Sequence, residues 1–89
     1  KAKCAEFAFV KNEAAFQKQL VKIGEKLAEL RKKKGYTSHE TFAYDYELSR
    51  VQYWRIEKGK SNLTLRSLYN LLEIHGIDLK DFFNSLPKG

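Results

Sequence analysis

Apolar residues recur at helical spacing near the start of the chain. Five of them follow one another at intervals of four, three, four and three residues: Phe16, Leu20, Ile23, Leu27 and Leu30. Because a helix turns by about 100° per residue, this spacing puts all five on one face. The pattern predicts a long helix with Asn12 as its N-cap. It should end at Gly35, after a basic turn at 31–34 that suits the negative end of the helix dipole.

Two short helices are predicted next, joined by a tight turn at 45–48. The first of them turns Phe42, Ala43 and Tyr46 inward, and either Thr37, in a capping box with Glu40, or Ser38 can cap it. The second covers residues 49–58. Ser49 with Gln52 three residues later forms a capping box, and Gly59 supplies a left-handed C-cap, so both ends are specified locally.

The last two predicted helices carry a leucine stripe and an aromatic pair. Thr64 is the expected N-cap of a helix that ends at Gly76, with four leucines turned inward: Leu65, Leu68, Leu71 and Leu72. Asp78 then caps a short helix that contains Leu79, Phe82 and Phe83. The chain therefore reads as an all-α domain of five helices over 12–89. Residues 1–11 form a short N-terminal arm, which suits either a strand or a segment that docks on a neighbour.

The predicted helix at 49–58 has two unlike faces. Tyr53 and Ile56, and less directly Gln52, fall on one side. The other side carries an indole, a valine and three cations: Arg50, Val51, Trp54, Arg55 and Lys58. A tryptophan left in water forgoes roughly 2 kcal/mol of burial, so this side is predicted to be a binding surface.

The charge of the chain is basic and unevenly spread. The formal net charge is +6 with a pI near 9.5, which favours a polyanionic partner such as nucleic acid or an acidic membrane. The first 36 residues hold ten Lys/Arg and four Asp/Glu, and residues 49–66 hold five positive charges against Glu57 alone. The lysines at 32–34 have two equally good interpretations, a solvated helix end or a second contact with phosphate.

The sequence lacks the residues that several classes of protein require. Cys4 is the single cysteine, no signal peptide is visible and no apolar run is long enough to span a membrane, which favours the cytoplasm. No metal or cofactor is expected, because His, Cys, Asp and Glu show no ligand spacing and there is no glycine-rich phosphate loop. His39 and His75 fall on different predicted helices, and His75 suits a partly buried helix end. An enzyme is therefore not expected.

The chain from about Ile23 to Phe83 resembles the phage-repressor and Cro type of helix-turn-helix domain, also called the xenobiotic-response-element (XRE) family. The resemblance rests on an ordered set of residues over roughly two-thirds of the chain: the run IGEKLAELRKKKG, then Phe42, Ala43, Leu48, Ser49, Ile56, Glu57 and Gly59, then TLRSLYNLLEIHGIDLKDFF. Three positions depart from the family pattern. Glu47 stands where the turn usually has glycine, Tyr53 replaces a small aliphatic residue, and His39 replaces the glutamine that opens the second helix.

The resemblance implies sequence-specific binding of double-stranded DNA by a transcriptional regulator. The second helix would lie across the phosphate backbone and helix 49–58 would enter the major groove. Base contacts then fall on Arg50, Val51 and Arg55, and Trp54 either packs on a sugar or base edge or covers a gap beside the turn. Candidates for phosphate contacts are His39, Lys58, Lys60 and Asn62. The family also pairs the acid at Glu57 with the first-helix arginine, here Arg31.

Two questions stay open from the sequence. One is whether the Trp54 and Val51 surface binds DNA or a protein, as in an antitoxin-like interaction module. The other is where two copies meet, because a single short helix implies a homodimer on a palindromic operator. The arm with Phe7 and Phe9 is the favoured contact, and the C-terminal Phe82, Phe83 and Leu86 are the second candidate.

Overall fold

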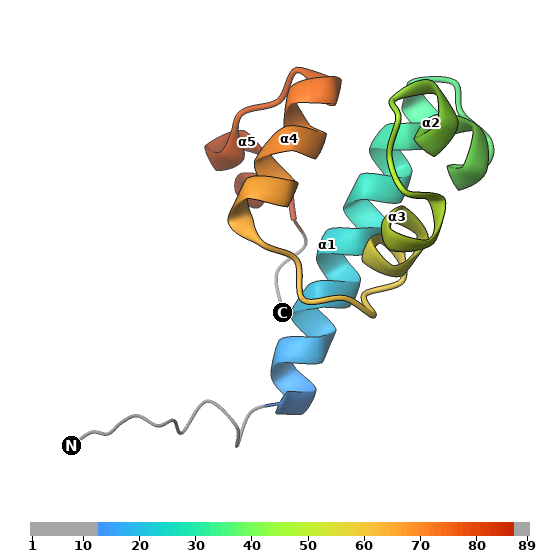
Figure 1. Cartoon of the computed structure of the whole chain (residues 1–89). Helices are drawn as coiled ribbons and strands as arrows, with labels where there is room; N and C mark the ends of the chain where they lie inside the picture. Colours follow the sequence, from blue (N-terminus) through green and yellow to red (C-terminus); the bar gives the residue numbers. More distant parts are fainter. Residues whose placement is uncertain (1–12, 87–89) are drawn as a thin grey trace.

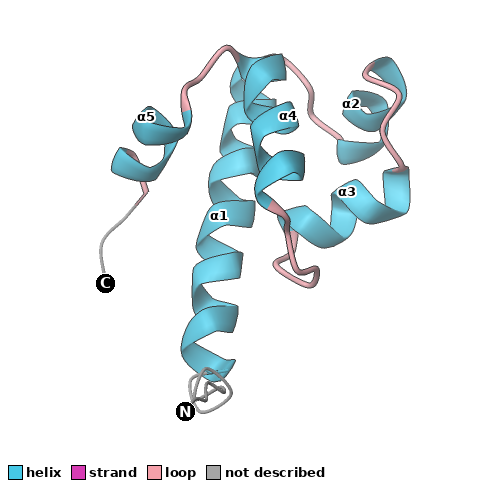
Figure 2. Ribbon diagram, turned by 60° about the vertical axis from the view of Figure 1, so that its left-hand side comes forward, coloured by secondary structure: helices cyan, strands magenta, loops and turns pink. Residues whose placement is uncertain are grey.

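The protein is all-α, as predicted. The computed structural model describes residues 13–86 and places five helices there: α1 (Glu13–Lys33), α2 (His39–Asp45), α3 (Arg50–Glu57), α4 (Leu65–His75) and α5 (Leu79–Asn84). The expected arm at 1–11, the Asn12 cap and the last three residues lie outside the described range. α2 and α3 lie together beside α1, and α4 and α5 lie on another side of it (Figures 1 and 2).

The local signals place the helix ends correctly. The hydroxyls of Ser38, Ser49 and Thr64 accept hydrogen bonds from the backbone three residues later, at 3.1, 3.3 and 3.1 Å. Thr37, the alternative cap of α2, is therefore not used. Asp78 occupies the N-cap position of α5 without making a side-chain capping bond.

Left-handed glycines end three of the helices. Gly35, Gly59 and Gly76 have φ of 102°, 70° and 68°. After α3 the backbone closes with two bonds, from the Gly59 N–H to the Ile56 carbonyl and from the Lys60 N–H to the Arg55 carbonyl. This pair of bonds is the Schellman arrangement, in which an L-residue in place of the glycine would be strained.

The core lies where α1, α2, α3 and α4 meet, with α5 closing one end. It consists of nine buried residues: Leu27, Leu30, Phe42, Ala43, Tyr53, Leu68, Leu71, Leu72 and Phe82. Phe42 is at its centre, since its ring packs on Tyr36, Tyr46, Tyr53 and His75 at centroid distances between 4.9 and 5.5 Å. Aromatic pairs of this kind contribute roughly 0.5 to 1.5 kcal/mol beyond burial.

Two apolar residues that the periodicity predicted to face inward do not. Phe16 is 47% exposed, because α3 and the loop after it reach α1 only from Gln17 onward and no described element covers the first turn. Leu65 is 64% exposed at the first turn of α4. In both cases the helical spacing was right, but the tertiary packing ends one turn short of it.

Candidate nucleic-acid interface

A shallow notch forms where the first turn of α2 meets the first turn of α3. Its volume is about 300 Å³, and it is lined by His39, Glu40, Arg50, Val51 and Trp54. Three of the four residues predicted to contact bases, together with one predicted to contact phosphate, therefore share one surface. Val51 is 59% exposed, and Arg50 extends into solvent, where its Nη1 lies 3.7 Å from the Glu40 carboxylate.

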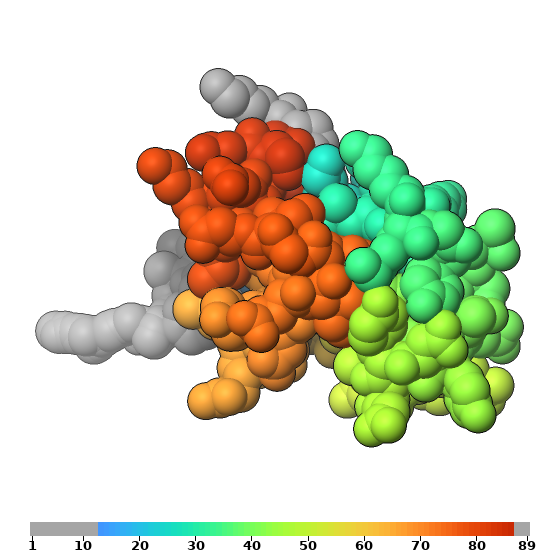
Figure 3. All heavy atoms as spheres, turned by 90° about the horizontal axis from the view of Figure 1, so that it is seen from above, coloured from blue at the N-terminus to red at the C-terminus, as the bar shows by residue number. Residues whose placement is uncertain are grey.

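The space-filling view shows how this surface stands relative to the rest of the molecule. In Figure 3, α2 and the start of α3, coloured green to yellow-green, form one part of the visible face. α4 and α5, in orange and red, form the other part. The notch residues come from the first of these two parts alone, so the candidate interface is built by the α2–α3 pair.

Trp54 is half-buried at the edge of the notch, and a cation covers it. The Lys60 Nζ lies 5.5 Å from the centroid of the indole. The Schellman turn at Gly59 brings Lys60 back to α3, because its N–H bonds the Arg55 carbonyl at 2.8 Å. A cation over an indole face contributes about 0.5 to 1 kcal/mol at an exposed site. The sequence suggested that Trp54 either packs on DNA or covers a gap, and its half-buried position leaves an edge for contact.

The remaining candidates lie outside the notch. Arg55, Lys58, Lys60 and Asn62 are exposed at the C-terminal end of α3 and in the loop that follows. None of them lines the notch that contains Arg50, so the structure divides the predicted residues into two groups. One group surrounds the first turn of α3, and the other surrounds its end.

α3 is joined to α1 by the ion pair that the family resemblance implied. Arg31 donates to the Glu57 carboxylate twice, from Nε at 2.8 Å and from Nη2 at 3.3 Å. The third guanidinium nitrogen, Nη1, donates to the Tyr36 carbonyl at 2.8 Å. Both side chains are buried, to 7% and 6% exposure. A paired charge with satisfied donors avoids the large cost of a lone buried ion.

The end of α3 also touches α1 backbone to backbone. A Cβ at Gly24 would lie 2.4 Å from the Glu57 carbonyl oxygen, and a Cβ at Gly59 would lie 2.8 Å from Val21. Gln17 adds a hydrogen bond from its side-chain amide to the Gly59 carbonyl. A glycine inside a predicted helix indicates either a break or a close helix contact, and at Gly24 the structure shows the contact. The bond of Gln17 depends on α3 packing on α1, so the pattern within α1 does not indicate it.

Tyr53 stands behind the ion pair, with its ring buried against Phe42. Its hydroxyl is buried beside the Glu57 carboxylate and makes no hydrogen bond to a described residue. Burial, followed by the neighbouring Glu57 carboxylate, raises the pKa of Tyr53. The phenol therefore stays neutral at physiological pH and fills space between α3 and α2.

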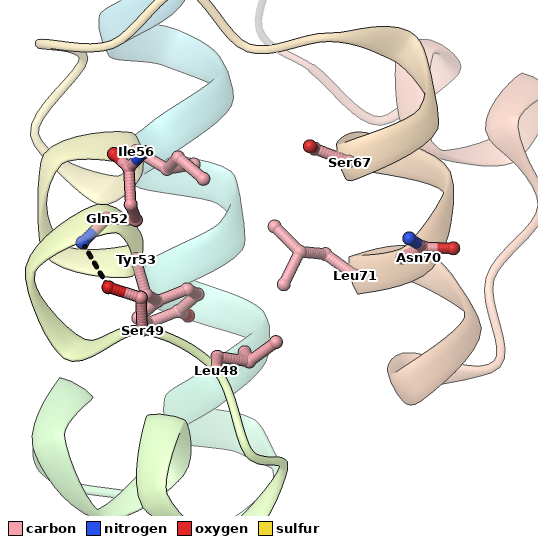
Figure 4. A pocket seen from close by; sticks show the side chains of 8 residues that line it. All are labelled: Leu48, Ser49, Gln52, Tyr53, Ile56, Ser67, Asn70 and Leu71. Atoms are coloured by element: carbon pink, nitrogen blue, oxygen red, sulfur yellow. Dashed lines mark hydrogen bonds between the residues drawn. The ribbon is translucent and has the colours of Figure 1, made fainter.

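α3 is less tightly held on the side of α4. A hollow of about 180 Å³ separates the two helices, and Figure 4 shows Tyr53 and Ile56 of α3 facing Leu71 of α4 across it. Polar side chains from both helices edge the opening, among them Gln52 and Asn70. α3 is thus anchored on α1 and α2.

Glu40 is the residue of the notch that sequence reasoning missed. In the sequence it stood out only as a partner for a capping box with Thr37. Its ion pair with Arg50 joins two helices across a turn, so no periodicity or local spacing indicates it.

No metal site is found among the described residues 13–86, because no group of three or more His, Cys, Asp or Glu there could hold a metal ion. No helix in the same range is long and apolar enough to cross a membrane.

The chain is similar to known proteins in sequence and in fold. The control protein C.MunI from Mycoplasma sp. is 38% identical over 68 residues, which are 76% of this chain and 92% of that protein. The plasmid copy control protein CopR from Streptococcus agalactiae is 40% identical over 45 residues, 51% of this chain and 49% of its own length. No family model matches the chain.

The chain is also similar to a protein of known structure. The restriction-modification controller protein C.AhdI from Aeromonas hydrophila superposes with a TM-score of 0.64 at 35% identity, covering 74% of this chain and 98% of that one. The sequence match to C.MunI spans nearly all of that relative, and the structural match spans nearly all of C.AhdI. By both comparisons, this chain belongs to the controller proteins of the XRE-type helix-turn-helix family, which are DNA-binding transcriptional regulators and not enzymes.

Proposed function

We propose that this regulator binds a palindromic operator as a symmetric homodimer, with α3 of each copy in the major groove. Arg50, Val51, Trp54 and Arg55 contact bases. The observation that carries the proposal is the notch, where Arg50, Val51 and Trp54 come together at the exposed first turn of α3. In helix-turn-helix proteins this turn is the one that meets base edges.

The side chains suit the chemistry of the groove. An arginine presents a fork of donors that matches the O6 and N7 acceptors of guanine, worth about 1 to 3 kcal/mol of discrimination. The exposed Val51 suits a thymine methyl group, and the free edge of Trp54 suits a base or a deoxyribose. Arg55, one turn further along α3, reaches the next base pairs.

Phosphate contacts are assigned to the residues around the base-contacting group. His39 lies on the α2 side of the notch, and Lys58, Lys60 and Asn62 lie at the other end of α3. Contacts to phosphates on both sides of the groove fix the register of α3 without reading sequence. They also release counterions, so affinity should fall steeply as salt rises.

The two copies meet, in this proposal, on a face formed by α4 and α5. A hollow there is lined by Leu65, Arg66, Tyr69 and Leu79, hereafter the α4–α5 patch. Leu65 and Tyr69 are 64% and 51% exposed, which is much apolar surface for one small face. Of the second candidate named from the sequence, Phe82 is buried in the core, Leu86 is half-buried against the core, and Phe83 is 46% exposed.

Charge along α4 supports this pairing. Arg66 lies toward one end of the exposed side of α4, and Glu73 lies two turns further along, with Tyr69 between them. A two-fold axis through Tyr69 brings Arg66 of each copy to Glu73 of the other. The interface is then self-complementary, as a two-fold dimer requires. The alternative contact through Phe7 and Phe9 lies outside the described residues.

The competing function is a protein-interaction module that uses the Trp54 and Val51 surface. Salt separates the two. We expect duplexes selected from a random DNA pool to share a palindromic sequence, and their affinity to fall by several orders of magnitude between about 50 and 200 mM salt. A pool that yields no shared sequence, or an affinity insensitive to salt, would overturn the DNA proposal in favour of a protein partner.

A further inference from the structure

We propose that Glu40 determines the specificity of this interface, by holding Arg50 across the notch and penalising DNA that offers Arg50 no guanine. The inference rests on the proposed function, because it concerns how Arg50 selects its base. The Glu40–Arg50 ion pair, on the surface that would meet DNA, is the observation behind it.

Glu40 and Arg50 come from different helices and meet in the open. Glu40 is the second residue of α2 and Arg50 is the first residue of α3. The Arg50 Nη1 lies 3.7 Å from the Glu40 Oε2, with 66% and 59% of the two side chains exposed. An exposed pair of this kind adds little to stability. Its position is more informative, because both residues line the notch.

Glu40 is the single acidic residue among those that line the notch. Every other charge predicted to meet DNA is positive, as a surface approaching phosphates requires. A carboxylate there opposes binding unless its charge stays balanced, and Arg50 is the cation within reach. The pair is thus an unfavourable element for DNA in general, of the kind that specific interfaces use against wrong partners.

Guanine changes this balance. The guanidinium has five donors, enough to bond O6 and N7 of guanine with one edge while another edge stays with Glu40. In that state Glu40 fixes the orientation of the fork. On a base without those acceptors, Arg50 either stays with Glu40 and makes no contact with DNA, or turns to a phosphate and leaves Glu40 unpaired beside the backbone. Both outcomes weaken binding to DNA that lacks the guanine.

The test compares Glu40→Gln, Arg50→Ala and the double variant with the wild type. Each is titrated against the selected duplex and a scrambled duplex of equal composition, at one salt concentration. Glu40→Gln keeps the shape and removes the charge, so binding to scrambled DNA should tighten by roughly threefold to tenfold, the scale of one charge contact. Binding to the selected duplex should stay equal or weaken. In the Arg50→Ala background, Glu40→Gln should change the affinity for both duplexes by the same factor.

Glu25→Gln is the matched control, because Glu25 is an exposed acid on α1 that does not line the notch. It removes the same charge and should change the affinity for both duplexes by the same factor. If Glu40→Gln behaves like Glu25→Gln, Glu40 contributes only to net charge and the inference is wrong.

The same experiment separates this inference from the function on which it rests. A wild type that binds selected and scrambled DNA equally contradicts the proposed function, and the role of Glu40 fails with it. If the wild type discriminates and Arg50→Ala loses discrimination while Glu40→Gln keeps it, the function stands and only the role of Glu40 is rejected.

Discussion

Glu47 is the residue with the least favourable backbone in the turn between α2 and α3. Its φ is 56°, and it is the one described non-glycine residue with positive φ. The family resemblance raised this possibility, because glycine usually stands there. The turn is closed by a bond of 2.8 Å from the Leu48 N–H to the Ala43 carbonyl, which holds Glu47 in the left-handed region. An L-residue there costs roughly 1 to 2 kcal/mol.

Glu47→Gly should therefore stabilise the protein, raising the free energy of unfolding by about 1 kcal/mol. Chemical denaturation measures this directly. Glu47→Ala is the control, since it removes the same charge but keeps a Cβ and the strain. Equal stabilisation by the two variants would assign the effect to the charge and not to the backbone.

His75 is a half-buried histidine that makes the stability of the fold depend on pH. Its ring stacks on Phe42 at a centroid distance of 5.5 Å, and its Nε2 is buried with no hydrogen-bond partner among the described residues. Burial, then the nearby Lys34 charge, lowers the pKa of His75 from its ordinary value of 6.5. Below pH 6.5 the unfolded chain binds a proton that the folded protein resists.

The stability should therefore fall as pH drops from 7 through 6.5 toward the lower pKa of the folded state. One proton sets the limit at about 1.4 kcal/mol per pH unit. Thermal unfolding of the wild type and of His75→Phe, which keeps the stacking and cannot titrate, measures the contribution. Parallel stability curves for the two proteins over pH 5 to 7 would show that His75 has no part in it.

Two helices, α1 and α2, hold α3 in place. Arg31, Gly24 and Gln17 of α1 meet Glu57 and Gly59 at its C-terminal end. Its N-terminal end, where the notch lies, is fixed by the turn from α2. The hollow toward α4 leaves the third side open. α1 and α2 together thus set the direction in which α3 points.

Glu57→Gln should lower stability by about 3 kcal/mol and weaken DNA binding as well, because it leaves the buried Arg31 charge without its partner. A double-mutant cycle with Arg31→Met separates the pair from the single effects, and we expect a coupling energy above about 1 kcal/mol. A coupling energy near zero would mean that the two side chains stabilise the fold independently and do not orient α3 as a unit.

How far the sequence predicts these elements depends on the range of the interaction. Caps such as Ser49 and Gly59 bond to residues three to five positions away, so the spacing of side chains indicates them. The ion pair of Arg31 with Glu57 spans 26 residues and was expected only from the family resemblance. The exposure of Phe16 and the pairing of Glu40 depend on which helix lies opposite, which periodicity does not contain.

In the proposed function each copy presents a single short helix to DNA, and a specific operator complex is therefore expected to need two copies. The α4–α5 patch gives a test by charge exchange. Arg66→Glu and Glu73→Arg should each weaken dimerisation, and the double variant should restore it, because the opposite charges then meet again across the two-fold axis. Sedimentation with and without a palindromic duplex measures this.

The competing dimer contact is tested in the same measurement. A chain that starts at Asn12 lacks Phe7 and Phe9 but keeps every described residue. If this chain no longer dimerises while the charge variants do, the arm joins the two copies and the α4–α5 patch does not.

Replacing guanine by 7-deazaguanine in the selected duplex tests whether Arg50 reads guanine in the major groove. That analogue removes the N7 acceptor and leaves base pairing intact. We expect one guanine in each half-site at which the replacement weakens wild-type binding by about 1 to 3 kcal/mol and has no further effect on Arg50→Ala. If every replacement affects wild type and Arg50→Ala equally, Arg50 does not read guanine and the assignment of the interface is wrong.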